Sequence, residues 1–66
     1  MFQVGDRIEM TSMRDDPDPI PIGTQGVVTF VNPVNLGGHF IQYGIKWDSG
    51  RSLMLCVPPD SARKIS

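Results

Sequence analysis

The sequence predicts an all-β fold made of five short strands, and three observations support this prediction. Seven Gly and six Pro are spread along the 66 residues, as short strands joined by many turns require. Several segments alternate apolar and polar residues with the period of two that is typical of half-buried strands. Clusters of Gly, Pro, Asn and Asp separate these segments, which is the pattern of strands joined by turns. One cysteine, Cys56, and one histidine, His39, cannot form an internal disulfide or a four-ligand zinc site.

The first strand is expected at residues 6–12, where Ile8 and Met10 alternate with polar neighbours. Three prolines within five residues then remove backbone donors and keep the chain extended, so residues 14–21 are expected to be a loop. The β-branched and aromatic run at 27–31 has apolar residues on both faces, which predicts the central strand.

The central strand is expected to end at Asn32 and Pro33, and a Gly-rich loop follows before the third strand. On that strand, alternate apolar residues up to Trp47 share one face. Residues 47–51 carry the signals of a tight hairpin turn, and the fourth strand is expected at 52–57.

Two prolines and Asp60 break the fourth strand before a short last segment at 61–65. A short 3₁₀ turn is expected at this break, capped by Asp60 or Ser61. Five strands with long first and second loops, one tight hairpin and a 3₁₀ turn before the last strand form the layout of an SH3-like β-barrel. Residues 1–66 are expected to form a single domain.

Charge and hydropathy narrow the functional classes. The formal net charge of −1 gives no electrostatic footprint for nucleic acid, so nucleic acid is an unlikely partner. No apolar run approaches the roughly 20 residues of a membrane span, and without a basic region followed by an apolar stretch at the start no signal peptide is expected. A cytoplasmic protein is therefore expected. Because short chains usually need a staple, a homo-oligomer is one remaining option.

Three segments and one further residue carry a family resemblance: Val4-Gly5-Asp6-Arg7-Ile8, Pro21-Ile22-Gly23-Thr24-Gln25-Gly26-Val27-Val28, Ile45-Lys46-Trp47-Asp48-Ser49-Gly50, and Asp60. With them the sequence resembles a family of short bacterial and phage proteins with an SH3-like barrel, known as a domain of unknown function. The resemblance runs nearly end to end. Part of the run is also similar to translation-associated barrels. The resemblance implies a fold but no activity and no binding residues.

Three carboxylates in the first loop, Asp15, Asp16 and Asp18, raise the question of a cation site. A calcium loop needs alternating acidic ligands, a central Gly and a distant Glu, whereas two prolines interrupt this cluster. A solvated acidic loop is the favoured interpretation, and neither a metal nor a cofactor is expected.

The sequence shows no complete set of catalytic residues. Cys56 and His39 are the only two residues that could form a Cys/His nucleophile pair. However, Cys56 is expected in an apolar strand, and His39 follows two glycines in a loop. No third orienting residue accompanies them. The protein is therefore expected not to be an enzyme, with no catalytic residues.

Aromatic residues of the third strand are candidates for contact with a ligand. Tyr43 and Trp47 share the parity of two isoleucines, so a place in the core is their default interpretation, with Trp47 expected to be the more buried. Phe40 has the opposite parity and lies beside the glycines, which makes it the better surface candidate.

Arginines offer an anion site. Arg7, Arg14 and Arg51 would bind a phosphate if the fold brought them together, although scattered surface arginines are more common.

The leading hypothesis is a non-enzymatic module that binds a protein or peptide partner through two long loops, Arg14–Ile22 and Asn32–Phe40. An alternative is a phage-type protein that sequesters a nucleotide signal, using arginines for phosphate and Phe40 for the base, in a pocket between subunits. A weaker alternative is an RNA- or ribosome-associated barrel. The candidate binding residues are Arg7, Arg14, Asp15, Asp16, Asp18, His39, Phe40, Tyr43, Trp47 and Arg51.

Overall fold

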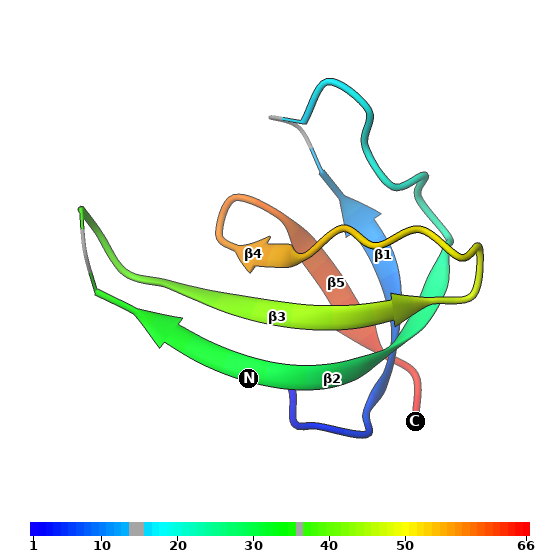
Figure 1. The fold of residues 1–66 in the computed structure, drawn as a ribbon, viewed down its shortest axis with the longest axis horizontal. Coiled ribbons are helices and arrows are strands. Elements are labelled where there is room, and N and C mark those ends of the chain that lie inside the picture. Colours follow the sequence, from blue (N-terminus) through cyan, green and yellow to red (C-terminus); the bar gives the residue numbers. More distant parts are fainter. Residues whose placement is uncertain (14–15, 36) are drawn as a thin grey trace.

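The protein is a single curled antiparallel sheet in the computed structural model, which describes residues 1–13, 16–35 and 37–66 (Figure 1). Its strands run in the order β4-β3-β2-β1-β5. They are β1 (Arg7–Ser12), β2 (Gln25–Val34), β3 (Phe40–Trp47), β4 (Leu55–Val57) and β5 (Ser61–Lys64). The prediction of an all-β fold with five strands is confirmed. No helix in the described part of the chain is long and apolar enough to cross a membrane.

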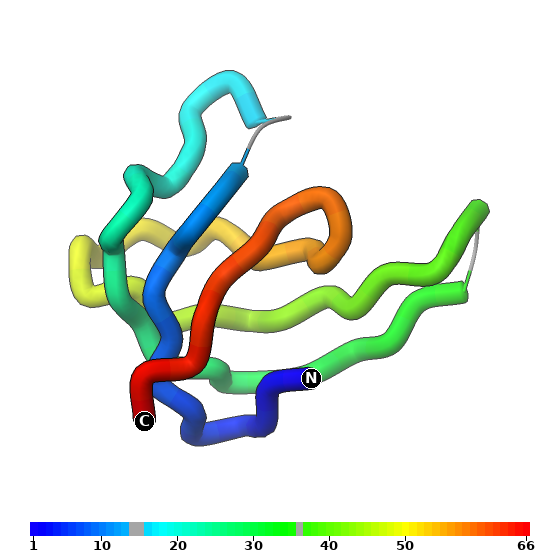
Figure 2. Tube along the Cα trace, turned by 180° about the vertical axis from the view of Figure 1, so that it is seen from behind, coloured from blue at the N-terminus to red at the C-terminus, as the bar shows by residue number. Residues whose placement is uncertain are grey.

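The two ends of the chain meet in the sheet. β1 pairs with β2 on one side, where Ile8 faces Gly26, and with β5 on the other, where Ile8 faces Lys64. The Arg7 carbonyl oxygen accepts hydrogen bonds from the Ile65 and Ser66 amides. The sheet curls so that β4 and β5, its two edges, contact each other near the turn that joins them (Figures 1 and 2).

β2 continues past the point where the sequence predicts its end, so the expectation that Asn32 and Pro33 end it is wrong. Pro33 faces Ile41 in the ladder, and pairing extends to Val34 opposite Phe40. A proline has no N–H, so it fits a strand only where its nitrogen points away from the neighbouring strand. The β1 side of β2 offers such a position, because β1 pairs with β2 only up to Val27.

A bulge changes which β2 residues face outward. Between Val28 and Phe30 the register with β3 shifts, so Thr29 is an extra residue on β2. Val28 is buried in the core, whereas Thr29 and Phe30 are exposed and lie over the outer side of Gly44. The sheet therefore carries an aromatic side chain on its outer face.

The fourth strand is shorter than expected, because it begins at Leu55 rather than at residue 52. The Leu53 carbonyl oxygen accepts a hydrogen bond from Trp47 Nε1 at 2.7 Å instead of pairing in the ladder. Pro58 and Pro59 form a turn before β5, and the 3₁₀ turn expected there is not confirmed.

The core is small and lies on the concave side of the sheet. Both Tyr43 and Trp47 are about 2% exposed, so the two are equally buried, against the expectation that Trp47 would be the more buried. The Tyr43 hydroxyl accepts a hydrogen bond from the Phe2 amide at 3.2 Å. The buried apolar residues are Ile8, Met10, Met13, Ile20, Val28, Tyr43, Ile45, Trp47 and Leu55.

Candidate functional site

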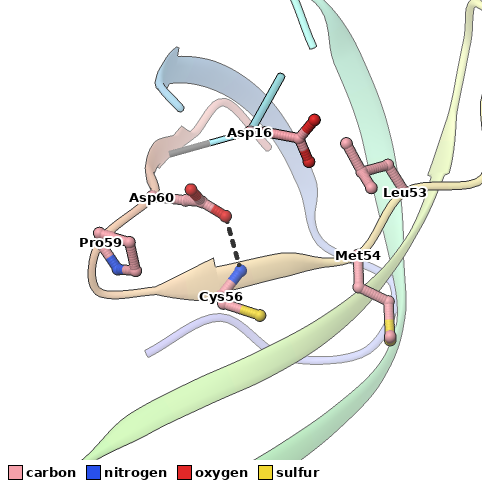
Figure 3. Close-up of a pocket in the computed structure, with 6 residues that line it drawn as sticks. All are labelled: Asp16, Leu53, Met54, Cys56, Pro59 and Asp60. Atoms are coloured by element: carbon pink, nitrogen blue, oxygen red, sulfur yellow. Dashed lines mark hydrogen bonds between the residues drawn. The ribbon is translucent and has the colours of Figure 1, made fainter. Parts of the chain in front are cut away.

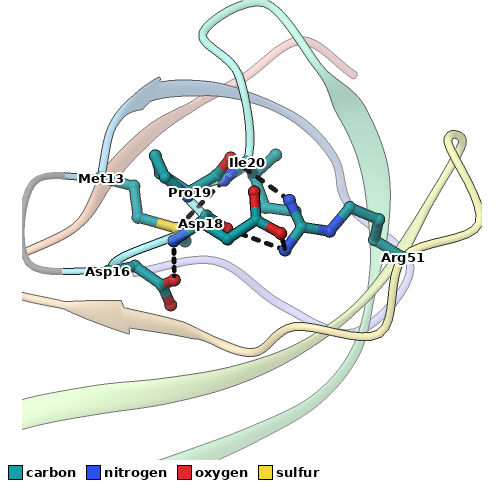
Figure 4. Close-up of polar contacts among 6 residues, drawn as sticks. All are labelled: Met13, Asp16, Asp18, Pro19, Ile20 and Arg51. Atoms are coloured by element: carbon teal, nitrogen blue, oxygen red, sulfur yellow. Dashed lines mark hydrogen bonds and ion pairs between the residues drawn. The ribbon is translucent and has the colours of Figure 1, made fainter.

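The loop between β1 and β2 is held against the body of the domain by Arg51, from the segment after the β3 hairpin turn (Figure 4). Arg51 Nη2 donates to the Asp18 carbonyl oxygen at 2.8 Å and lies 3.3 Å from Asp18 Oδ2, and Nη1 donates to the Pro19 carbonyl oxygen at 3.3 Å. A planar guanidinium suits this work because its donors form a fixed fork. The loop residues 18–19 therefore have a defined position.

The same loop is fixed from inside by two further bonds. The Ile20 amide donates to the Met13 sulfur at 3.3 Å, and the Ile20 side chain is buried in the core. The Asp18 amide donates to Asp16 Oδ1 at 2.9 Å, which orients the Asp16 carboxylate (Figure 4). In the sequence, Pro17 and Pro19 thus alternate with Asp16, Asp18 and Ile20, whose hydrogen bonds hold the loop in place.

Across from this loop, Asp60 closes the outer edge of β4 (Figure 3). Asp60 Oδ2 accepts a hydrogen bond from the Cys56 amide at 2.9 Å, and the Asp60 amide donates to the Cys56 carbonyl oxygen at 2.8 Å. Both backbone groups of Cys56 are satisfied in this way. An incoming strand would find no free donor or acceptor at Cys56, the middle residue of β4.

The loop and the β4–β5 turn enclose a hollow of about 310 Å³, which we call the acidic groove (Figure 3). Its floor and sides are mainly apolar, and a carboxylate stands on each side. Asp16 comes from the loop and Asp60 from the turn. The groove is lined by Asp16, Leu53, Met54, Cys56, Pro59 and Asp60.

Cys56 lines this groove and is partly buried. Burial raises the pKa of the Cys56 thiol, and the negative charge of Asp60 raises it further. A thiol held in its neutral form is a poor nucleophile. His39, the other member of the considered pair, is exposed on the β2–β3 connection, where its Nδ1 lies 3.0 Å from Asn35 Oδ1. The two residues share neither a hydrogen bond nor a pocket in the described structure.

The arginines considered for an anion site have separate partners. Arg7 Nη1 lies 2.8 Å from Asp48 Oδ2, whereas Arg51 is bound to the first loop. Arg7 lines a second, open hollow of about 600 Å³ together with Val27, Lys46, Trp47, Asp48 and Gly50. Arg14 and Asp15 lie outside the described residues. The structure therefore does not join Arg7 and Arg51 in one cluster.

Among the aromatic candidates, Tyr43 and Trp47 belong to the core and Phe40 is half-buried on the outer face of β3. Sequence reasoning missed Phe30, which is 42% exposed. The sequence signal for an exposed Phe30 is Gly44 on the next strand, because a residue without a side chain leaves space for an aromatic ring. The bulge at Thr29 brings Phe30 opposite this glycine.

The sequence placed Asp16 and Asp18 in the first loop. In the structure Asp16 lines the acidic groove, and Asp18 contacts Arg51, which holds the loop. Sequence reasoning missed Met54, Cys56 and Asp60 as groove residues. Within residues 1–13, 16–35 and 37–66, no three His, Cys, Asp or Glu side chains are grouped to hold a metal ion.

The fold and the site together define a small all-β domain in which the acidic groove lies beside one anchored loop. The model of the family described as a domain of unknown function, DUF4314, matches residues 1–65, so the chain belongs to this family. Comparison with curated proteins and with solved structures gave no match.

Proposed function

We propose that this protein is a non-enzymatic interaction module that binds an extended segment of a partner protein in the acidic groove. The observation that carries the proposal is that two walls from distant parts of the chain each have their own hydrogen bonds. Arg51 fixes the first wall and Asp60 fixes the second. A preformed groove lowers the ordering cost of binding.

The groove chemistry favours an apolar side chain next to Lys or Arg in the partner. Leu53, Met54 and Pro59 supply apolar contact, while Asp16 and Asp60 are the charged groups among the described residues that line the groove. Each carboxylate uses one oxygen for a backbone amide, which leaves the other oxygen for a cation.

Side-chain recognition is the mode of binding that we infer. Addition of a partner strand to β4 is disfavoured because Asp60 occupies both backbone groups of Cys56. An extended peptide that lies across the groove needs no such groups. We also assign the curled five-stranded sheet to the SH3-like barrels, on its strand order and its long first loop, and we expect a cytoplasmic protein of bacterial or phage origin.

The first loop, expected at 14–22, contributes to this groove, whereas none of the described residues of the second, 32–40, lines it. A nucleotide-binding protein has less support, because Arg7 and Arg51 are engaged with Asp48 and with the first loop. RNA binding also has less support, since the groove is acidic.

A peptide-display selection on the purified protein tests the proposal, followed by calorimetry with the selected synthetic peptides. We expect enrichment of Lys or Arg beside an apolar residue. Met54→Ser should remove on the order of 1–2 kcal/mol of apolar contact and so weaken binding roughly 5- to 30-fold. Ile22→Ser is the matched control, because Ile22 is 77% exposed and does not line the groove.

Charge is tested separately with Asp16→Asn, which should weaken binding of a basic peptide about 2- to 5-fold. Glu9→Gln is its control, since Glu9 pairs with Arg63 on the outer face of the sheet. Selection of acidic peptides, or equal binding by Met54→Ser and Ile22→Ser, would refute the proposed groove.

A further inference from the structure

The central part of the chain is free of charged residues. None of the six basic and seven acidic residues lies between Val27 and Ile45, although this segment supplies most of the two longest strands. Charged side chains normally cover exposed sheet faces, so a charge-free exposed face requires an explanation.

Much of this segment forms an extension that we call the β2–β3 arm, residues 29–34 of β2 and 40–44 of β3. The far end of the arm reaches beyond the other strands (Figures 1 and 2). β1 pairs with β2 only as far as Val27, and Val28 is the last β2 residue whose backbone bonds to the segment before β1, at Gly5 and Asp6, in the described structure. On its other side, β4 pairs with Ile41, Gln42 and Tyr43 of the arm, so the open edge of the arm is that of β2.

The outer face of the arm is apolar at both ends, and the polar side chains between the ends bond to each other. Phe30 lies over Gly44 at one end, and Val34 faces Phe40 at the other. Between them, Asn32 Nδ2 donates to Gln42 Oε1 at 3.2 Å. The central amides thus already bond to each other across the strands.

We propose that the outer face of the β2–β3 arm packs against the same face of a second copy of this chain. In a twofold contact each residue near the axis meets its own copy, so charged residues there would repel one another. The absence of charge from 27 to 45 removes that repulsion. Depletion of charge together with aromatic residues such as Phe30 and Phe40 also marks the centres of protein interfaces.

The contact is face to face and not edge to edge. Pro33 interrupts the open edge of β2, where it offers no N–H to a partner strand. Six residues of β2 and five of β3 give a face about 17–20 Å long, and two strands make it about 10 Å wide. This footprint is well below the roughly 800 Å² per partner of a standard interface. The dimer is therefore reversible, with a Kd between about 10 μM and 1 mM.

Sedimentation velocity and light scattering on the whole chain, from about 10 μM to 2 mM, test the proposal. The average mass should rise from 7.3 kDa toward twice that value with concentration. Asn32→Asp places two carboxylates near the twofold axis while Gln42 can still donate to residue 32. We expect this variant to associate at least tenfold more weakly.

Ser49→Asp is the matched control, because it makes the same change in net charge at an exposed turn away from the arm. It should associate like the wild type, and thermal unfolding should show that both variants are folded. A constant mass of 7.3 kDa over the whole range would overturn the proposal and leave the arm to a different partner. Equal association of Asn32→Asp and Ser49→Asp would also overturn it, as would loss of association in Met54→Ser alone, which would place self-association in the acidic groove.

Discussion

The ring of Phe30 fills the space directly outside Gly44, its partner on the neighbouring strand. A Cβ atom on Gly44 would overlap ring carbons Cδ2 and Cε2 of Phe30 and would lie 2.7 Å from Thr29 Oγ1. The glycine exposes backbone that the ring covers, an arrangement known to stabilise glycines in antiparallel sheets. The bulge at Thr29 makes the arrangement possible by bringing Phe30 to the outer face.

Gly44→Ala should therefore lower the free energy of unfolding by about 1–3 kcal/mol, because the methyl group must displace the ring. Urea unfolding measures this loss. In a Phe30→Ala background the same substitution should lower the free energy of unfolding by at least about 0.5 kcal/mol less than in the wild type. A double-mutant cycle measures this coupling, whose expected size is that of residues in contact. Additive effects of the two substitutions would show that the ring and the glycine do not interact.

Arg51 should stabilise the first loop as well as the fold. Arg51→Met removes its bonds to Asp18 and Pro19, so we expect a loss of about 1–2 kcal/mol in urea unfolding and faster proteolysis within the loop. Arg63→Met is the control, since the exposed Arg63 side chain pairs only with Glu9 in the described structure, and its loss should stay below about 0.5 kcal/mol. Equal losses in the two variants would contradict the anchoring role of Arg51.

Asp6 should make stability depend on pH in the acid range. A hydrogen bond from the Gln3 amide lowers the pKa of Asp6, and the nearby Lys64 ammonium lowers it further against the opposing effect of burial. A lowered pKa in the folded state stabilises the protein above the unfolded value of about 3.9, and this stabilisation is lost as the pH falls through the folded value.

The Asp6→Asn variant should therefore be less stable than the wild type at pH 7, and the two should converge as the pH approaches about 2. Chemical unfolding at a series of pH values measures the difference. A difference that stays constant from pH 7 to the acid limit would show that ionisation of Asp6 does not contribute.

Cys56 should react slowly with alkylating reagents. Burial and the charge of Asp60 raise the pKa of its thiol, so the reaction with iodoacetamide should accelerate at a higher pH than the reaction of an ordinary thiol does. Asp60→Asn keeps an oxygen for the Cys56 amide but removes the charge, and it should move the rate profile toward lower pH. The protein unfolded in urea is the reference, and a profile identical to that reference would contradict the prediction.

Strands with strict alternation were predictable from the sequence. The first was expected at 6–12 and is Arg7–Ser12, and the third ends at Trp47 as expected. The extent of β2 was not predictable, because whether Pro33 ends a strand depends on whether another strand lies on its nitrogen side. That is a property of the sheet and not of the local sequence.

The candidate site was predictable only in part. Prolines and aspartates identify the first loop, but Arg51 lies more than thirty residues away, and nothing local indicates that it bonds to Asp18. Likewise Asp60 could be recognised as a turn residue, whereas its bonds to both backbone groups of Cys56 depend on the geometry of the β4–β5 turn.

The pairing of Ile8 with Lys64 has a consequence for synthesis on the ribosome. β1 emerges before its two partner strands, and its β5 edge has no partner until residue 64 has left the exit tunnel. At about 5–20 residues per second, the nascent chain spends several seconds with this edge open. The sheet is therefore completed only after translation has passed residue 64, and early chaperone contacts should fall on the β1 segment.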